Sequence, residues 1–523
     1  MHRTKGNVPG NQLILRMIRR APCLREPTVT TRGVATMLLA GAAALALAAC
    51  ASNVRKPVTP LPAAFEAPAG TQDLGVQGLD RWWTVFGDEQ LNQLEDQALK
   101  NSPDAKTQAA KLLEAVATRK SAILQTYPTG DITGGPTRQT TNAIGPQPVG
   151  DIFPVGGVTE NDDFNFKVSW EFDFLGALND ARKEARHEFQ ATRFNIESAR
   201  ASLVANVADS YFQARGLAIQ LADATEQADI ETKLQKTAQT KADLGLGPRS
   251  DADRIAGDLA QARSNVDSLQ AQQHAAQRLL LILVGRGPEP VENLPLTANV
   301  PDPPQLPEAV PGSLLARRPD VRQADEAMRA ETLKTKLAKE ELFPNITIMP
   351  ALGVAHQVAP GVGIIQSAAG FLFFPQQQTT NSDYWSIGAN IDQPVLDIPR
   401  LLQDAKAEGA RAEQSVVAYE QAVQNAYGDA ENALVELASD ERRIKILEDG
   451  EVRARRAYDD ERIRYRAGLD DVTSVLSAEQ TWRTDQSDLT GERVQALRRA
   501  VQTYKALGGG WDFQPLKTAA KSP

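Results

Sequence analysis

The stretch that decides the fold reads FNFKVSWEFDF, residues 164–174, and alternates strictly between apolar and polar side chains. This period of two is typical of a β-strand with two different faces. Aromatic residues occupy all of its apolar positions except Val168, although aromatic residues make up only 6% of the chain. Its length is about that of the 9 to 11 residues that cross a membrane in a tilted barrel. We therefore expect a membrane-crossing strand, and a strand of a soluble sheet is the alternative.

The second half of the chain repeats the pattern. Apolar residues alternate in 346–354 and again in 385–391, and a weaker strand is predicted near Ile132. Segments rich in Gly, Pro, Thr and Asn, 136–163 and 356–383, are predicted to be exposed loops between the strands. The chain then has four strands, whose membrane-facing side chains include Phe164, Phe166, Trp170, Phe172 and Trp385.

Four strands are too few to close a barrel with an interior, which takes about eight or more. Open strand edges are not tolerated in lipid, because no water is present to bind their backbone groups. Several copies must therefore share their strands around a symmetry axis. Three copies would supply twelve strands, enough to surround a pore, so we expect a homotrimer in contact with membrane lipid.

The rest of the chain is predicted to be mainly α-helical and internally duplicated at a spacing of about 220 residues. Helical, Ala-rich and charged stretches dominate both copies. The landmarks that recur are Pro103-Asp104 and Pro319-Asp320, Tyr127-Pro128 and Phe343-Pro344, Asp180-Ala181 and Asp404-Ala405, Gly245 and Gly468, and Gly285 and Gly508.

The spacing of these landmarks predicts the geometry of each half. A helix rises about 1.5 Å per residue, so a helix from Asp180 to Gly245 would be about 97 Å long. Two shorter helical stretches in the same half, placed end to end, have about the same combined length. We expect each half to contain one long helix that turns back at a glycine and pairs with the two short ones.

The amino terminus reads as a secretory leader, basic at first and then apolar as far as Ala49. It ends in Leu47-Ala48-Ala49-Cys50, which resembles a bacterial lipobox and predicts lipid attachment to Cys50; a leader with a chance cysteine is the alternative. The predicted divisions are a signal peptide (1–49), a lipidated tether and equatorial segment (50–100), a first repeat (101–287), a Pro-rich linker (288–316), a second repeat (317–511) and a tail (512–523).

Composition and motifs argue against an enzyme, a cofactor and a metal site. The four histidines are isolated from other metal-ligating side chains, and no Walker loop or Gly-x-Ser-x-Gly motif is present. The net charge of −9 becomes −15 without the leader, which carries seven basic residues and one acidic residue. This acidic balance disfavours a nucleic-acid partner.

Four short motifs carry a resemblance to a known family. They are Trp82-Trp83 with Phe86-Gly87-Asp88, Ser169-Trp170-Glu171-Phe172-Asp173, Arg317-Arg318-Pro319-Asp320-Val321, and Tyr504 to Trp511. In this order they resemble the outer-membrane efflux protein family (TolC/OprM-like), most closely the NodT-type lipoproteins. The resemblance implies a trimeric outer-membrane β-barrel that continues as a helical barrel into the periplasm.

The same resemblance implies partners and a working tip. The partners would be a periplasmic adaptor protein and an inner-membrane pump of the resistance-nodulation-division (RND) class. The adaptor would dock where the helices turn, at Leu244, Gly245, Leu246 and Gly247 and at Gly468 and Leu469. A gate would use Tyr465 and, in place of the family's usual aspartates near Ser474 and Ser477, Asp470 and Asp471. For these two aspartates, a plain solvated helix end is the alternative.

The function expected from these features is a passive outer-membrane conduit of a tripartite efflux system in a Gram-negative bacterium, exporting drugs or other small molecules. An exit duct for type I protein secretion is an alternative with the same architecture. A structural lipoprotein with a periplasmic coiled coil is an alternative from another class. That last protein would not need strands with alternating aromatic residues.

Overall fold

The computed structural model describes residues 54–67, 79–141, 157–304, 311–367 and 370–511. All of its elements belong to one unit that begins at Asn53. The predicted lipid attachment site, Cys50, lies outside the described residues. None of the described helices combines the length and the apolar character that crossing a bilayer requires.

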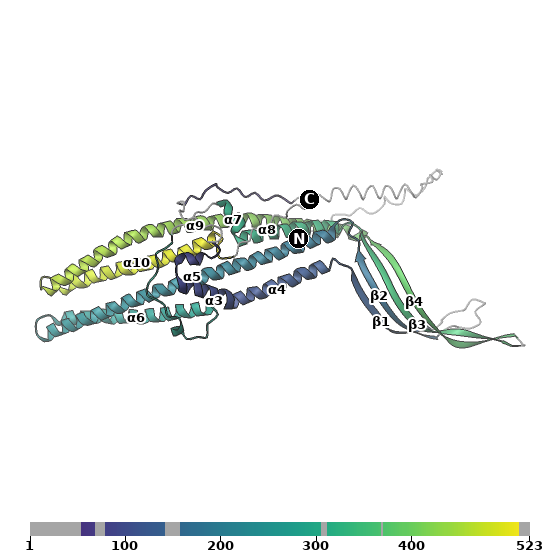
Figure 1. The fold of residues 1–523 in the computed structure, drawn as a ribbon, viewed down its shortest axis with the longest axis horizontal. Coiled ribbons are helices and arrows are strands. Elements are labelled where there is room, and N and C mark those ends of the chain that lie inside the picture. Colours follow the sequence, from purple (N-terminus) through teal and green to yellow (C-terminus); the bar gives the residue numbers. More distant parts are fainter. Residues whose placement is uncertain (1–53, 68–78, 142–156, 305–310, 368–369, 512–523) are drawn as a thin grey trace, which may run out of the picture. The chain divides into compact units, whose positions relative to one another are not determined.

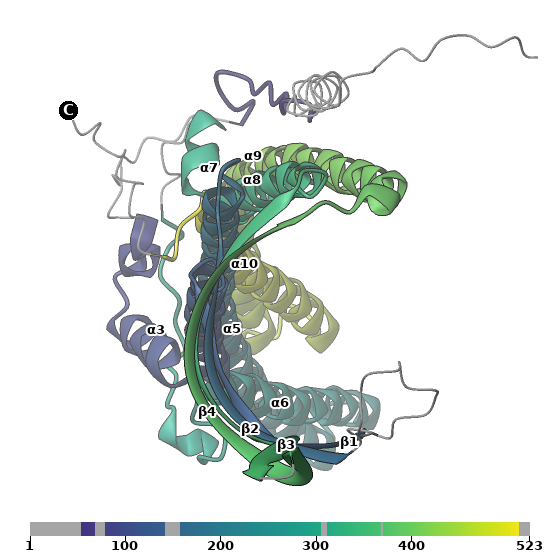
Figure 2. The ribbon, with the colours of Figure 1, turned by 90° about the vertical axis from the view of Figure 1, so that its right-hand side faces the viewer.

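Four antiparallel strands form one sheet in the order β1-β2-β3-β4, which confirms the predicted four strands per chain. Figure 2 shows that this sheet is strongly curved, with β1 and β4 at its two edges. The sheet consists of two antiparallel hairpins, β1-β2 and β3-β4, and the helices α5 to α8 lie between them in the sequence. The strands are β1 (Thr129–Thr141), β2 (Gly157–Glu171), β3 (Asn345–Ser367) and β4 (Gly370–Asp392).

The register aligns apolar residues in rows across the sheet. Residues directly opposite each other in antiparallel strands share a face. One row joins all four strands through Ile132, Phe166, Leu352 and Trp385, whose exposed fractions are 66%, 41%, 59% and 75%. The row on the other face is polar except for Ala351, and consists of Asp131, Lys167, Ala351 and Ser386. The sheet therefore has one apolar and one polar face.

The apolar face forms a belt of limited height. It begins at the pair Ile346 and Ile391 and continues to the pair Phe164 and Val354. Eight residues of β3 separate these two rows, which corresponds to about 26 Å of strand. Beyond the belt the same face becomes polar, in the row Asp162, His356 and Asn381. Strands of a transmembrane barrel are tilted by about 35–45°, so this length gives a belt about 20 Å high, close to the apolar band of such barrels, about 25 Å.

The strands extend further than the sequence predicted. The loop prediction for 356–383 was wrong, because β3 continues to Ser367 and β4 begins at Gly370. Cross-strand hydrogen bonds outweigh the low strand propensity of the Gly, Pro and Gln residues there. At the other end, β2 stops at Glu171, so Phe172 lies just beyond the strand. Its backbone N–H still donates to the carbonyl of Ile346, at 2.8 Å.

Each half contains one long helix and two main shorter ones, as predicted (Figure 1). In the first half, α5 (Ala177–Asp243, 67 residues) packs against α4 (Pro103–Leu124) and α6 (Arg249–Leu283). In the second half, α9 (Ile398–Arg466, 69 residues) packs against α8 (Pro319–Glu340) and α10 (Val472–Ala506). Shorter elements are η1 (Trp82–Phe86), α3 (Glu89–Asn101), η2 (Val291–Asn293), α7 (Pro311–Arg317) and η3 (Val395–Asp397).

Equivalent glycines end the helices of both halves. Gly245 and Gly468 follow α5 and α9 with φ angles of 71° and 72°. The residue after each glycine donates its backbone N–H to a carbonyl five residues earlier. Leu246 donates to the carbonyl of Lys241, and Leu469 donates to that of Arg464. This is the Schellman arrangement, which needs a left-handed residue and so favours glycine. Gly285 and Gly508 end α6 and α10 in the same way, with φ of 81° and 80°.

The largest core lies where η1 and α3 meet α5 and α10. Trp82 stacks on Tyr504 with ring centroids 5.6 Å apart, and Phe86 contacts Phe212 at 4.9 Å. All four rings are buried. The two halves of the chain are therefore joined by an aromatic core at the level where α6 and α10 end.

The apolar belt predicts that a single charge placed within it lowers the stability of the inserted barrel. Lysine in place of Ile387, which is 68% exposed at mid-height of the belt, would place a charge in hydrocarbon and destabilise the inserted barrel by about 2–4 kcal/mol. Ser386→Lys, one residue away on the polar face, is the matched control. Urea unfolding in lipid vesicles would measure both, and equal losses would contradict this assignment of the two faces.

Candidate channel tip and the junctions that position it

Both helical turns expose leucines to solvent. Leu244 and Leu246 are 67% and 75% exposed at the turn between α5 and α6, and Leu469 is 74% exposed at the turn between α9 and α10. The Schellman glycines hold these side chains outside the helix ends. Free apolar side chains at a turn suit contact with another protein. The predicted docking residues are therefore accessible in both turns.

Two polar contacts and a small apolar cluster connect the two hairpins near the turns. The ammonium of Lys241 on α5 donates to the hydroxyl of Tyr465 on α9 at 3.2 Å and lies 4.4 Å from the centre of its ring. Arg254 on α6 donates to the hydroxyl of Thr473 on α10 at 3.1 Å. Between them lies a cluster of Ala238, Ala252, Ile255 and Val472, with Tyr465 packed against it.

The two predicted gate aspartates have local partners. Asp471 is the N-cap of α10 and accepts from the backbone N–H of Ser474 at 2.9 Å. Asp470 accepts from the backbone of Asp471 and the hydroxyl of Ser474, and pairs with Arg464 at 3.1 Å. These hydrogen bonds lower the pKa of Asp470. Both carboxylates thus stabilise the start of α10, and a role in the gate stays a prediction.

A layer of buried charge lies between α5 and α10, further from the turns. Glu479 and Glu231 are 3% and 5% exposed, and both oxygens of Glu479 lack a hydrogen-bond partner among the described residues. Arg483, also buried, stands 3.9 Å from Glu479 and 3.5 Å from Glu226. On the α9 side, Tyr458 borders this layer. Its ring stacks on the ring of Trp482 of α10, with centroids 5.2 Å apart.

Burial controls the protonation of this layer. Removal from water raises the pKa of Glu479 to about 7, because the charged form loses its hydration; Arg483 lowers it, and Glu231 raises it further. Burial also raises the pKa of Glu231. A carboxylic acid that titrates near neutral pH therefore lies between the two hairpins.

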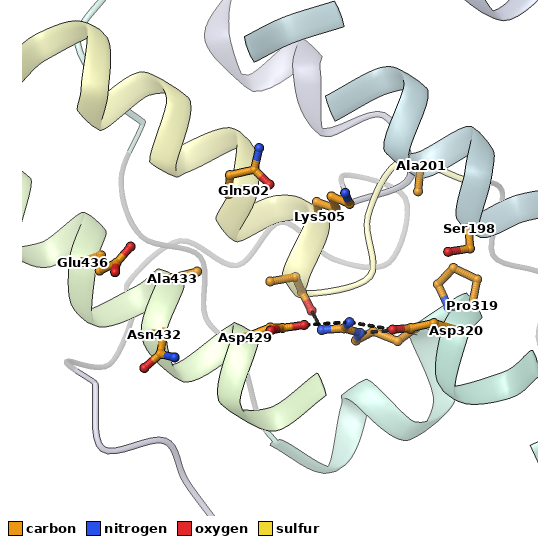
Figure 3. Close-up of a pocket in the computed structure, with 12 residues that line it drawn as sticks. Ser198, Ala201, Pro319, Asp320, Asp429, Asn432, Ala433, Glu436, Gln502 and Lys505 are labelled. Carbon is orange, nitrogen blue, oxygen red and sulfur yellow. Dashed lines mark hydrogen bonds and ion pairs between the residues drawn. The ribbon is translucent and has the colours of Figure 1, made fainter. Parts of the chain in front are cut away.

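A second junction centres on Arg318, directly before α8. Its guanidinium pairs with Asp320 at 2.6 Å and with Asp429 of α9 at 3.1 Å. Figure 3 shows these two aspartates at the ends of the dashed contacts, beside Lys505 and Gln502 of α10. Arg318 also donates to the carbonyl of Ala506 at the end of α10, at 3.4 Å. This single arginine ties α8, α9 and α10 together.

The segment before η1 lies along α9. Arg55 pairs with Glu413 at 2.7 Å and with Glu420, while Phe65 stacks on Tyr427 at 5.6 Å. These partners extend over about four turns of α9, from Glu413 to Tyr427, so the segment follows the helix. The part of this segment from Arg55 to Phe65 is thus attached to α9.

A protein-family model described as "Outer membrane efflux protein" matches residues 94–286 and 310–509, which is most of the chain. The chain belongs to the outer membrane efflux protein family. This confirms the family that the short motifs resembled, and with it an outer-membrane efflux channel protein. The family is one of transport proteins.

Named relatives match this efflux protein along nearly its whole length. Pyoverdine export outer membrane protein OpmQ of Pseudomonas aeruginosa is 27% identical, over 90% of this chain and 96% of the relative. Cation efflux system protein CusC of Escherichia coli is 26% identical, over 91% and 98%. The solved outer-membrane channel OprN has a TM-score of 0.73 at 24% identity, covering 88% of this chain and all of OprN, and its likeness establishes the fold.

Sequence reasoning found the turns of this efflux protein and Tyr465, and missed the partners that position them. Lys241, Arg254 and the buried pair Glu231 and Glu479 were not singled out, because on the sequence they are ordinary charges of long polar helices. The one available signal was the spacing of Glu479 and Arg483, four residues apart on one face. Among the described residues no cluster has the ligands for a metal ion.

The buried layer predicts how stability depends on pH. Since folding raises the pKa of Glu479 from 4.5 to about 7, the folded state holds this proton more tightly. Its contribution to stability is complete below about pH 4.5 and is lost as the pH rises through about 7. Glu479→Gln should flatten the fall in the thermal unfolding midpoint between about pH 5 and pH 8.

The matched control is Asp488→Asn, which removes an exposed carboxylate from the same helix. It should leave the pH dependence unchanged. If the thermal unfolding midpoint of Glu479→Gln falls with pH as steeply as that of the parent protein, Glu479 does not titrate in this range.

Proposed function

We propose that this protein is the outer-membrane channel of a tripartite efflux system, in which three copies form one passive conduit for drugs or other small molecules. The observation that carries the proposal is a four-stranded sheet with an apolar belt on one face, whose edge strands β1 and β4 pair with no further described strand. Such a sheet can sit in lipid only when its edges are paired with other copies. Three copies give a closed ring of twelve strands.

The polar face of the sheet would line the pore. Asp131, Lys167 and Ser386 share this face in one row. A barrel of this kind alternates apolar residues toward lipid and polar residues toward water. The conduit would therefore be water-filled, and the energy for transport would come from an inner-membrane pump of the RND class.

The lipid anchor and the tether support the same placement. Cys50 would carry the lipid, and Arg55, five residues later, is held on α9 by Glu413 and Glu420. Glu413 lies about four turns into α9, which is about 22 Å from its start. Five extended residues span up to about 17 Å, so a tether continuing along α9 would bring Cys50 close to the sheet end of the helix.

At the turns, a periplasmic adaptor protein would dock and the hairpins would separate. Leu244, Leu246 and Leu469 would supply the apolar contact. The contacts from Lys241 to Tyr465 and from Arg254 to Thr473 would hold the resting tip narrow. Opening must break these contacts and little else at the tip, because the apolar cluster beside them is small.

Single-channel recording tests the gate. The double substitution Tyr465→Ala and Arg254→Ala removes both polar links and should raise the conductance of the purified protein in planar bilayers. Thr232→Ala, whose hydroxyl bonds only within α5, is the control and should conduct as the parent does. A monomeric protein whose double variant leaves the bilayer silent would refute the channel.

Crosslinking in cells tests the docking surface. Leu246→Glu with Leu469→Glu places two charges in the proposed contact and should abolish co-purification of the periplasmic adaptor, identified by mass spectrometry. Conductance of the variant should remain that of the parent, since neither leucine links the hairpins. Undiminished adaptor recovery would place docking elsewhere.

A further inference from the structure

We propose that a recess beside Arg318 binds solutes as they pass through the channel, and that it favours small zwitterions, which carry both an ammonium group and a carboxylate group. This inference rests on the channel proposed above and adds to it a binding site and a class of solute. The observation that carries it is that an unpartnered ammonium group and an unpartnered carboxylate oxygen line the same cavity.

The recess lies where four helices meet. Figure 3 shows side chains from α5, from the start of α8, from α9 and from the end of α10 around it. Its volume is about 400 Å³, which falls within the roughly 300–1,000 Å³ of sites that hold small molecules. Part of the wall is apolar and consists of Ala201, Ala433 and Ala506. These small side chains leave room for a solute between the polar groups.

The basic end of the recess is formed by α10 and α5. Lys505 is only partly exposed, and its ammonium group has no ion-pair or hydrogen-bond partner among the described residues. The amide of Gln502 and the hydroxyl of Ser198 also line the recess, and neither has a partner in the described part of the chain. All three groups can donate hydrogen bonds to a carboxylate.

The acidic end of the recess is formed by α9. The guanidinium of Arg318 is held by both oxygens of Asp320, and it reaches Asp429 only at Oδ2, 3.1 Å away. Oδ1 of Asp429 has no partner among the described residues, and this side chain is 59% exposed. Two turns along α9, Glu436 also lines the recess, and its Oε2 pairs with Arg499. The free oxygens of this end can accept hydrogen bonds from an ammonium group.

The balance of charge favours a solute that carries both signs. The recess and its ion pairs contain equal numbers of basic and acidic groups, namely Arg318, Arg499 and Lys505 against Asp320, Asp429 and Glu436. A solute with a carboxylate alone would meet Lys505 but also the free oxygen of Asp429. A solute with an ammonium group alone would face the opposite conflict. A zwitterion satisfies both ends and leaves the balance unchanged.

On α9, the recess lies on the side away from the tether. The lipid proposed for Cys50 would be outside the barrel, so the segment that leads from it follows the outer side of the wall. This segment contacts α9 at Tyr427 and Glu431. Asp429 is two residues from each of them, and a helix turns by about 200° over two residues. Asp429 therefore points toward the lumen.

The orientation of α10 agrees. Tyr504 stacks on Trp82 in the aromatic core, on the side of η1. Gln502 is two residues earlier and exposed, so it faces away from that core. Both helices thus place the recess on the wall of the conduit that the passing solute meets.

Three copies would place three such recesses at one level of the conduit, since each chain contributes one. A site on a conduction path must release its solute as readily as it binds it. The groups here suit weak binding, because they are open to water and their charges are screened. The recess would enrich zwitterions in the lumen, as a preference added to that of the pump.

Equilibrium binding to the full-length protein in lipid nanodiscs tests the selectivity. The probes are 6-aminohexanoate, hexanoate and hexylammonium, which share one chain and differ in their charged groups, and saturation-transfer NMR would measure their dissociation constants. The zwitterion should bind about tenfold more tightly than either single ion, the factor expected for one additional charge-assisted hydrogen bond.

Two substitutions should separate the two ends. In Lys505→Gln, 6-aminohexanoate should lose its advantage over hexylammonium and keep its advantage over hexanoate. In Asp429→Asn the reverse should hold. The matched control is Lys445→Gln, which removes an exposed lysine five turns beyond Tyr427, on the tether side of α9, and should change neither preference.

Thiol modification tests the lumenal position. In the background Tyr465→Ala with Arg254→Ala, attachment of a polyethylene-glycol maleimide to Gln502→Cys should lower the single-channel conductance. Attachment to Lys445→Cys should leave the conductance unchanged. Equal effects at the two positions would contradict the placement of the recess in the lumen.

The outcomes separate this site from the channel itself. Equal affinity for the three probes, in a trimeric protein that conducts, would overturn the recess and leave the channel standing. Loss of both preferences in both recess variants would mean collapse of the cavity rather than two separate contacts, and would also overturn it. A monomeric protein whose opened variant conducts nothing would overturn the channel and the recess together.

Discussion

The backbone groups at the edges of the sheet impose the constraint on which the rest of this protein depends. The outer sides of β1 and β4 present N–H and C=O groups that no other described strand pairs, next to an apolar belt suited to lipid. In hydrocarbon each unpaired group costs several kcal/mol, so a single copy cannot be the membrane form. The proposed assembly of several copies around a shared pore follows from this one requirement.

The helical part is held together unevenly, and the unevenness matches the proposed motion. Between the two halves, a large aromatic core including Trp82, Phe212 and Tyr504 is fully buried. Near the turns, the described residues of the two halves share a small cluster around Ile255 and two polar contacts. Regions with few buried apolar contacts open at lower free energy, so separation of the hairpins is expected to begin at the turns. The buried acid Glu479, whose pKa burial raises to about 7, lies between these two regions.

Several elements were predicted well because each has a strong local signal. The alternation around Trp170 predicted β2, and the paired glycines Gly245 and Gly468 predicted the ends of α5 and α9. The extent of β3 and β4 was not predicted, since segments rich in Gly, Pro and Gln resemble loops until a partner strand supplies their hydrogen bonds. The partners of Tyr465 and Glu479 on α5, Lys241 and Glu231, were not predicted either. They come from the other half of the chain, and nothing in the local sequence marks them.

The sequence by itself determined the periodicities: alternation by two in the strands, long helical repeats, and a duplication whose landmarks recur in order. Periodicity depends on residues that are neighbours along the chain, so it can be recognised without a structure. Only the tertiary structure decided the register, because hydrogen bonding between distant strands and packing between distant helices depend on contacts that no local pattern specifies. That register placed Phe166 beside Leu352 and Leu352 beside Trp385, and so gathered apolar side chains of different strands on one face of the sheet.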